Sequence, residues 1–262
     1  MKNTIKKLLL ILLFVASFNS CSKDESTPSS TTTLIPQEGL NAWYSFNGNT
    51  NDGSGNGNNG SVNGATLTTD KFGASNKAYS FDGSSNNINL PKSFLNGSSV
   101  TKFAFYTRVK FNSITNSPNI WGKTLLNGNV NFYVTNNGVV TFEWVHSYGG
   151  VKFSKIYSDN NVITIDNWYD IVVVLENAIG RIYVNGNLIT TNLLWRDQAG
   201  STLSTTNVSS NCNFTQDTDS SKFGSRITSG VTGAYLNGTI DDFGIWNRAL
   251  ALSEVQDLYN LK

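Results

Sequence analysis

A strict alternation of side-chain character over residues 103–111 constrains the fold of this chain more than any other feature. Because neighbouring side chains of a β-strand point to opposite faces, this period of two predicts a strand with apolar residues inside and polar residues outside. Residues 139–145 and 168–175 are predicted to form further strands, and the apolar run 171–175 is typical of a strand covered on both faces. The residues predicted to face inward over 103–111 are Phe103, Phe105, Thr107, Val109 and Phe111, and those predicted to face outward are Ala104, Tyr106, Arg108 and Lys110.

Asn-Gly pairs mark the connections between such segments. Asn185-Gly186 and Asn137-Gly138 each lie between two apolar segments, and Asn127-Gly128 is a third pair of this kind. A two-residue type I′ turn needs positive φ at both central residues, which Asn-Gly supplies, so each pair predicts a β-hairpin. The chain contains 36 Asn and 23 Gly, and both residue types favour turns over helices, which argues against a helical protein.

One short helix is expected at the C-terminal end. Ser253 followed by Gln256 has the spacing of a capping box, and an apolar side follows it. No second linker interrupts the chain after Gly39, so residues 39–262 are predicted to form a single domain. The fold predicted for it is all-β, a two-sheet antiparallel sandwich with a short C-terminal helix. The apolar residues predicted for one side of the helix are Val255, Leu258, Tyr259 and Leu261.

The first twenty residues have the order of a secretory signal sequence. Lys2, Lys6 and Lys7 precede an apolar run over 8–16, which at about nine residues is shorter than the ~20 that span a bilayer. The small residues before Cys21 resemble the bacterial lipoprotein box, which implies cleavage after residue 20 and lipidation of Cys21. Acyl chains on this cysteine would hold a domain on a membrane. An ordinary secreted protein with an incidental cysteine is the alternative.

Residues 21–38 are predicted to form a lipidated, flexible tether. Ser, Thr and Pro dominate this segment, which shows no periodicity. Lys23, Asp24 and Glu25 resemble the surface-export signal of Bacteroidetes lipoproteins, although a solvated charge cluster would look the same. We therefore expect an outer-membrane lipoprotein displayed at the cell surface.

The charge balance argues against nucleic acid as a partner. The chain has 19 basic and 18 acidic residues, and without the three lysines of the signal sequence 16 basic residues remain. The mature chain is therefore mildly acidic, whereas a nucleic-acid-binding protein needs a basic face to neutralise phosphates. The membrane is expected to be a partner only through the lipid anchor.

Three segments in this order carry a family resemblance. They are residues 39–60, with Trp43-Tyr44-Ser45-Phe46, residues 168–186, and residues 236–250, with Asp241-Asp242-Phe243-Gly244. Together they resemble the laminin G-like jelly-roll family of concanavalin A-like lectins and glucanases, from Gly39 to Lys262. The resemblance implies two curved antiparallel sheets of about six strands each, the concave one often forming a ligand groove. It also implies a module that binds glycan or protein, sometimes beside a hydrolase.

The arrangement of acidic residues predicts no catalysis. Glycosidases hold two carboxylates across the scissile bond, but Glu143 has no second acid two or four residues away on its predicted strand. Asp241 and Asp242 are adjacent and would point to opposite faces of a strand. His146 is the single histidine, so a zinc site built on imidazoles is not available. Cys212 has no partner if Cys21 is lipidated, so no internal disulfide is predicted.

Calcium is the metal that the resemblance implies, as a structural ion. In this superfamily a calcium ion often joins the N-terminal segment to the Asp that opens the last strand, which implies Asp241 as a ligand. Asp52, Asn47 and Asn49 are the oxygen-bearing candidates in the N-terminal segment, and oxygens of these types suit calcium. In the alternative interpretation Asp52 forms a turn and Asp241 makes strand-end hydrogen bonds.

Two clusters are candidates for contacts with a sugar, which needs a flat aromatic ring and polar groups around it. Trp195 and Arg196 are predicted to open a long Ser/Thr/Asn-rich loop, and long loops are often functional. His146 and Tyr148 form the second cluster at a strand end, and Trp144 is a further candidate. The sequence therefore predicts a non-catalytic surface module that binds an extracellular polysaccharide or glycoprotein. A structural or adhesion module that binds protein and a diverged glycoside hydrolase are the alternatives, and Trp195 could instead pin its loop to the sandwich.

Overall fold

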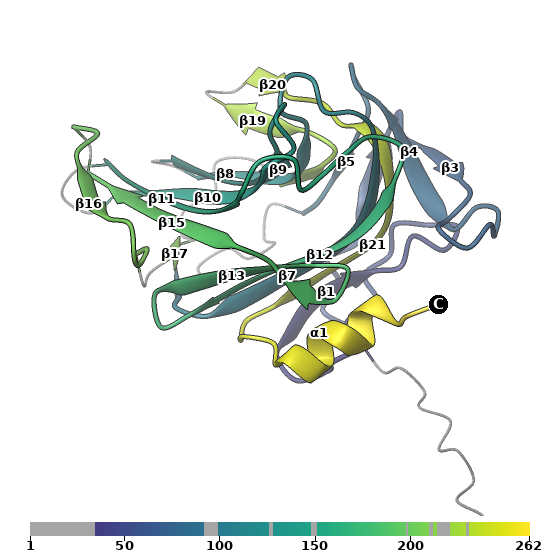
Figure 1. Ribbon diagram of the computed structural model, residues 1–262. Helices are drawn as coiled ribbons and strands as arrows, with labels where there is room; N and C mark the ends of the chain where they lie inside the picture. The colour runs from purple at the N-terminus through teal and green to yellow at the C-terminus, as the bar shows by residue number, and fades with distance from the viewer. Residues whose placement is uncertain are drawn as a thin grey trace, which may run out of the picture. The chain divides into compact units, whose positions relative to one another are not determined.

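Two antiparallel sheets pack face to face in the computed structural model of the protein, with one short helix on the outside (Figure 1). This confirms the predicted all-β sandwich with a C-terminal helix. Eight and nine strands make up the two sheets within the described residues, more than the six each that the resemblance implies. The structure describes residues 35–91, 99–125, 128–147, 151–197, 199–209, 212–213, 221–228 and 231–262.

The first sheet has the strand order β14-β13-β12-β7-β21-β4-β3, and β1 also pairs with β21. The predicted strands at residues 103–111 and 168–175 correspond to β7 and β12, which lie side by side in its centre. The bounds of its strands are β1 Leu40–Tyr44, β3 Thr66–Thr68, β4 Ala78–Asp82, β7 Phe103–Ser113, β12 Trp168–Glu176, β13 Ile179–Val184, β14 Asn187–Leu188 and β21 Asn237–Trp246.

The second sheet has the order β16-β15-β11-β10-β9-β8-β18-β5-β2. Its strands are β2 Ser61–Asn63, β5 Asn87–Asn89, β8 Asn119–Leu125, β9 Gly128–Val134, β10 Val140–Ser147, β11 Val151–Ser158, β15 Thr191–Arg196, β16 Thr202–Ser204 and β18 Lys222–Phe223. Two small ribbons complete the β structure, and the helix follows β21. These elements are β6 Ser99–Val100 with β17 Cys212–Asn213, β19 Arg226–Thr228 with β20 Val231–Gly233, and α1 Leu252–Tyr259.

Aromatic side chains fill the space between the two sheets. Phe105 of β7 lies 4.8 Å from Phe142 of β10, measured between ring centroids, and 5.2 Å from Trp121 of β8. Phe103 packs on Phe142 in the same way, at 4.9 Å. The residues of 103–111 predicted to face inward therefore do so, and burial of these large apolar surfaces is the main force that holds the sheets together.

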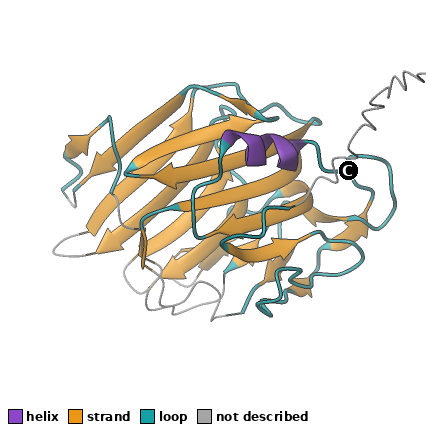
Figure 2. Ribbon diagram, turned by 90° about the horizontal axis from the view of Figure 1, so that it is seen from below, coloured by secondary structure: helices purple, strands orange, loops and turns teal. Residues whose placement is uncertain are grey.

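The other face of β7 differs from the prediction. Tyr106 is fully buried and Arg108 is 1% exposed, although both were predicted to face solvent. Helix α1 lies across this face of the first sheet (Figure 2), and its Leu258 joins Tyr106 and Trp246 in a second, smaller apolar cluster. The prediction was wrong because a period of two distinguishes the two faces of a strand but not whether a helix covers one of them.

The two Asn-Gly hairpins with described turns use different geometry. Asn185 and Gly186 have φ of 51° and 77°, as the predicted type I′ turn requires. In the second pair Gly138 has a φ of 68°, and Asn137 is not among the residues with positive φ. Its loop runs from Thr135 to Val139 and closes with a bond from the Thr135 N–H to the Val139 carbonyl (3.0 Å), so it is longer than predicted. Asn127 lies outside the described residues.

Helix α1 begins two residues earlier than the predicted capping box. Ala251 is the N-cap, and its N–H donates to the Glu254 carboxylate at 2.8 Å, so Ser253 and Gln256 do not form the box. Glu254 is further held by Arg248 at 2.6 Å. Val255 and Leu258 are buried, as predicted for one side of the helix.

The predicted signal sequence, the lipidated Cys21 and residues 22–34 of the predicted tether lie outside the described residues. Within the described part of the chain, no helix has both the length and the apolar character needed to cross a membrane.

Candidate binding site on the second sheet

The outer face of the second sheet carries a band of polar side chains. Along β10, Phe142 and Trp144 point into the core, so the alternate residue Glu143 points outward. Glu143 is paired with Asn131 of β9 on one side and with Lys155 of β11 on the other, and directly paired residues share a face. We call this outer surface the polar face. It carries Asn131, Tyr133, Thr141, Glu143, Lys155, Tyr157, Asn192 and Arg196.

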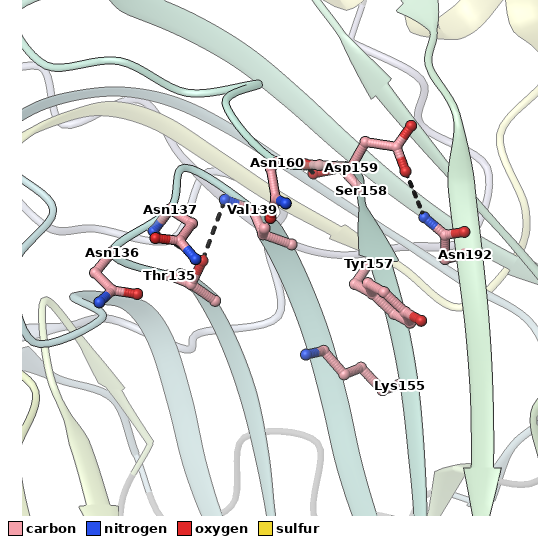
Figure 3. Close-up of a pocket in the computed structure, with 10 residues that line it drawn as sticks. All are labelled: Thr135, Asn136, Asn137, Val139, Lys155, Tyr157, Ser158, Asp159, Asn160 and Asn192. Atoms are coloured by element: carbon pink, nitrogen blue, oxygen red, sulfur yellow. Dashed lines mark hydrogen bonds between the residues drawn. The ribbon is translucent and has the colours of Figure 1, made fainter.

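A pocket of about 670 Å³ opens on the polar face (Figure 3). Lys155 and Tyr157 of β11 line it together with Asn192 of β15, and the β9–β10 loop and the end of β11 supply the remaining residues. Four of the lining side chains are asparagine amides, which can both donate and accept hydrogen bonds. The lining residues are Thr135, Asn136, Asn137, Val139, Lys155, Tyr157, Ser158, Asp159, Asn160 and Asn192.

Backbone hydrogen bonds hold the β9–β10 loop in place beside the pocket. The N–H of Asn161 donates to the carbonyl of Asn137 at 2.8 Å, and the N–H of Ile163 donates to that of Gly138 at 3.0 Å. A Cβ atom on Gly138 would collide with the Ile163 carbonyl oxygen, so a residue without a side chain is needed at this close approach. This side of the pocket is therefore formed before a ligand arrives.

The opposite side is fixed by the end of β11. Ser158 Oγ accepts a bond from the Val140 N–H and donates to the Asp159 carbonyl, both at 2.9 Å. The Asp159 carboxylate accepts a bond from Asn192 Nδ2 at 2.9 Å, which links the rim of the pocket to β15 (Figure 3). The amide of Asn192 is thus oriented by a charged partner.

Lys155 and Tyr157 lie against each other inside the pocket. The Lys155 ammonium is 4.7 Å from the centroid of the Tyr157 ring, a cation–π contact worth about 0.5–1 kcal/mol at an exposed site. Partial burial lowers the pKa of Lys155, the positive charge of Arg196 adds to this, and Glu143 opposes it. Both side chains are half-buried, so each remains within reach of a ligand.

Glu143 is engaged by its own neighbours on the polar face. Tyr133 Oη donates to it at 3.0 Å, and Asn131 Nδ2 does so at 3.3 Å. Burial, together with the negative charge of Glu143, raises the pKa of Tyr133, so the phenol remains a donor at neutral pH. Of the residues that line the pocket, Asp159 is the one that carries a carboxylate. This donor and acceptor set suits binding of a polar molecule better than acid–base chemistry between two carboxylates.

Trp144 and Trp195 do not belong to this pocket, contrary to their prediction as sugar contacts. Trp144 is completely buried in the core, where it packs on Phe142 and Phe103. Trp195 lies within β15 instead of a long loop, and it pairs with Ser154, which in turn pairs with Trp144. Directly paired residues share a face, so Ser154 and Trp195 lie on the core face with Trp144, and Trp195 points away from the polar face. The predictions of Trp144 and Trp195 as sugar contacts are therefore corrected.

Arg196 lies on the polar face and is exposed, as a ligand contact requires. His146 belongs to β10, but its side chain is outside the described part of the structure. Tyr148 and the side chain of Cys212 also lie outside the described residues.

The residues predicted to bind calcium do not fit that ion. Asp52 is occupied by its own loop, because its carboxylate accepts the N–H groups of Trp43, Ser54 and Asn58 at 3.1, 2.9 and 3.0 Å. Asp241 lies instead beside Arg108, with 3.7 Å from its Oδ2 to Arg108 Nη1.

The two predicted asparagine ligands make local contacts. Asn49 Oδ1 accepts the Asn51 N–H at 2.9 Å, and Asn49 Nδ2 donates to the Asn47 carbonyl at 3.3 Å. No group of three His, Cys, Asp or Glu side chains is arranged to hold a metal ion among the described residues. Asp52 therefore acts as a loop former, as in the alternative interpretation.

The pocket residues Lys155, Tyr157 and Asn192 were not predicted from the sequence. A usable signal exists, because Phe153, Lys155 and Tyr157 alternate with small or apolar residues over 153–158. That pattern predicts a strand with one large polar side, although it does not identify what lies across from it.

Comparison with known proteins gives one family match. The family described as the concanavalin A-like lectin/glucanases superfamily (Laminin_G_3) matches residues 82–256, which is most of the described domain. No curated protein sequence matches the chain.

Solved structures resemble the sandwich at low sequence identity. Domain 4 of AbnA, a GH43 extracellular arabinanase from Geobacillus stearothermophilus, in complex with arabinotriose, has a TM-score of 0.56 and 19% identity, over 84% of this chain and 98% of that one. The receptor-binding domain of botulinum neurotoxin type G has a TM-score of 0.55 and 16% identity, over 85% and 51%. The ligand-binding domain of botulinum neurotoxin serotype D, in complex with N-acetylneuraminic acid, has a TM-score of 0.55 and 14% identity, over 86% of this chain and 51% of that one. The chain thus spans about half of each neurotoxin domain, and at these identities the likeness concerns the fold.

Proposed function

This chain belongs to the concanavalin A-like lectin/glucanases superfamily, and we propose that it is a non-catalytic module that binds an extracellular glycan in the pocket on its polar face. The observation that carries the proposal is the position of Tyr157, a half-buried aromatic ring that lines the pocket together with four asparagine amides. Fold alone does not decide between lectins, adhesion modules and hydrolases, so the proposal depends on this site.

The chemistry of the pocket matches that of a sugar. The C–H face of a pyranose or furanose ring packs on an aromatic side chain, while its hydroxyls need groups that donate and accept. Asn136, Asn137, Asn160 and Asn192 offer such groups in the lining of the same pocket (Figure 3). The fixed β9–β10 loop reduces the loss of conformational freedom on binding.

Two of the structures with a similar fold are complexes with sugars, arabinotriose in the arabinanase domain and N-acetylneuraminic acid in the serotype D domain. They support a sugar as the class of ligand. Because the two sugars differ, which sugar this chain binds depends on the residues of its own pocket.

The test is titration calorimetry of residues 35–262 against soluble glycans that first bind on an array. We expect Tyr157→Ala to weaken binding at least tenfold, because the ring is the main apolar surface offered to the sugar. Tyr259→Ala is the matched control, since Tyr259 is an exposed tyrosine of α1 on the far side of the sandwich, and it should bind within twofold of the wild type. Failure of every glycan to bind, or full affinity in Tyr157→Ala, would contradict the proposal.

The absence of catalysis is tested on the glycans that bind. We expect no release of reducing ends over hours of incubation, because the pocket lining offers one carboxylate instead of the pair that hydrolysis needs. Release that disappears in Glu143→Gln would instead identify a diverged glycosidase.

We also propose that the module is held at the cell surface by acyl chains on Cys21, followed by the Ser/Thr/Pro-rich tether. Metabolic labelling with radioactive palmitate tests the anchor, which should be lost in Cys21→Ala. Removal of the domain from intact cells by an added protease tests its display at the surface.

A further inference from the structure

Lys155 is a cation without a partner in the pocket. No hydrogen bond or ion pair joins its ammonium to another residue in the described part of the chain, and the Tyr157 ring is the group it contacts. Figure 3 shows the Lys155 side chain beside the Tyr157 ring. Half-burial makes an unpaired charge costly, so Lys155 gains more from a counter-ion than a fully solvated lysine would.

The nearby carboxylates already accept hydrogen bonds from other residues. Glu143, which faces Lys155 across the strands, receives bonds from Tyr133 and Asn131. Asp159, at the rim, receives one from Asn192. Both carboxylates are therefore held by neutral donors, and neither forms an ion pair with Lys155 among the described residues.

Arg196 adds a second cation on the same face. It follows Leu194, the residue paired with Lys155, by two positions on β15, so both point outward. Arg196 is exposed and close enough to disfavour a proton on Lys155, and no described carboxylate pairs with it. Two like charges held near each other create a local preference for an anion.

We propose that the pocket selects an acidic sugar, one with a carboxylate of the uronic or sialic acid type that pairs with Lys155. This deepens the proposed function and rests on it. The incoming carboxylate draws the ammonium away from the Tyr157 ring, because a charge-assisted hydrogen bond is stronger than a cation–π contact. The ring face released by this movement is then free to pack on the sugar, while the asparagine amides hold its hydroxyls.

The test compares each acidic oligosaccharide with the same molecule after its carboxylates have been reduced to alcohols. Oligogalacturonates and a sialylated trisaccharide are the probes, measured by titration calorimetry at low salt. We expect the acidic form to bind at least tenfold more tightly than the reduced form. The preference should shrink as salt is raised, since the pocket is open to solvent.

Variants assign the preference to one side chain. Lys155→Ala should abolish the tenfold preference but retain binding of the reduced form, and Lys155→Arg should preserve the preference. Lys102→Ala is the matched control, because Lys102 is an exposed lysine paired with Glu176 on the other sheet, and its removal changes net charge equally. Circular dichroism and melting curves establish that each variant is folded.

The outcomes separate this inference from the proposed function. Equal affinity for acidic and reduced forms, with binding still lost in Tyr157→Ala, would overturn the acidic ligand and leave the glycan site intact. An undiminished preference in Lys155→Ala would also overturn it. If neither form of any probe binds and no other glycan binds on the array, both proposals fail together.

Discussion

Charged side chains are paired on one outer face of the sandwich, whereas Lys155 and Arg196 lack ionic partners on the other, among the described residues. On the first sheet, beneath α1, Arg108 lies 2.9 Å from both Asp170 and Asp242, and Tyr106 donates to Asp170 at 2.7 Å. We call this covered surface the closed face. On the polar face of the second sheet, Lys155 and Arg196 have no ionic partner among the described residues, and solvent reaches both.

The difference follows from whether a second layer covers the sheet. A charge removed from water must be paired and hydrogen-bonded, because the desolvation of a lone ion costs more than a small domain can offset. Arg108 meets this condition with carboxylates and with the carbonyl of Leu261, to which its Nη2 donates at 2.9 Å. On the polar face Lys155 is only half-buried and Arg196 is exposed, so both can remain without an ionic partner and stay available to a ligand.

The largest expected effect is a difference in the free energy of unfolding between two variants, one with a substitution on each face. Arg108→Met should lower the free energy of unfolding by about 3–5 kcal/mol, because it leaves buried carboxylates without their cation. Lys155→Met should change it by about 0.5 kcal/mol or less, since Lys155 has no ionic partner to lose. Urea denaturation measures both, and similar losses in the two variants would refute the distinction.

The cover itself is tested by Leu258→Ala. Leu258 is fully buried between α1 and the first sheet, and removing its side chain should cost about 2–4 kcal/mol. Leu188→Ala is the control, because Leu188 is 57% exposed at the sheet edge and should cost far less. A negligible loss for Leu258→Ala would mean that the helix is not held by this contact.

The closed face also predicts a dependence of stability on pH. Burial raises the pKa of Asp241 to about 6, against the opposing pull of Arg108, so between about pH 4 and pH 6 the folded state holds more protons than the unfolded state. Stability should therefore rise as pH falls from 7 to 5, on the order of 1 kcal/mol for this group. Burial and the charge of Asp241 raise the pKa of Asp242 as well, so this group acts in the same direction. Asp241→Asn should therefore reduce the gain in denaturation curves at the two pH values.

At lower pH the trend should reverse. Backbone hydrogen bonds hold the pKa of Asp82 below its usual range, and the bonds from Arg248 do the same for Glu254. Their stabilisation is lost as these groups take up protons below about pH 4. Stability that falls steadily from pH 7 to 5 would contradict the assignment of Asp241.

The smallest effect concerns the start of the covering helix. Ala251 has an extended backbone, as N-caps do, but no side-chain oxygen, so Ala251→Ser should raise stability by about 0.5–1 kcal/mol. Ser253→Ala should be neutral within about 0.5 kcal/mol, because Ser253 lies inside the helix. A loss of about 1 kcal/mol in Ser253→Ala would restore the capping box predicted from the sequence.

The architecture could be predicted because local patterns carry it. The alternation around Phe105, the apolar run in β12 and the Asn185-Gly186 turn each reflect an interaction within a few residues, and all three are confirmed. The burial of Arg108 could not be read in this way, since it depends on a helix about 150 residues later in the chain.

The site was harder to predict because it depends on register across strands. Tyr157, Asn137 and Asn192 meet through the pairing of β9, β10, β11 and β15, which no local pattern specifies. Trp195 shows how sensitive this is, because a shift of one position along a strand moves a side chain to the opposite face. Its neighbour Arg196, one residue further, does lie on the polar face.

The path of the chain into the sandwich has a consequence for orientation. Ile35 packs on the apolar cluster beneath α1, and the Trp246 indole nitrogen donates to the Pro36 carbonyl at 2.7 Å. Whatever precedes Ile35 therefore joins the domain from the closed side. The point at which the chain enters the domain and the pocket therefore lie on opposite sheets, so a ligand can approach the pocket without meeting this entry segment.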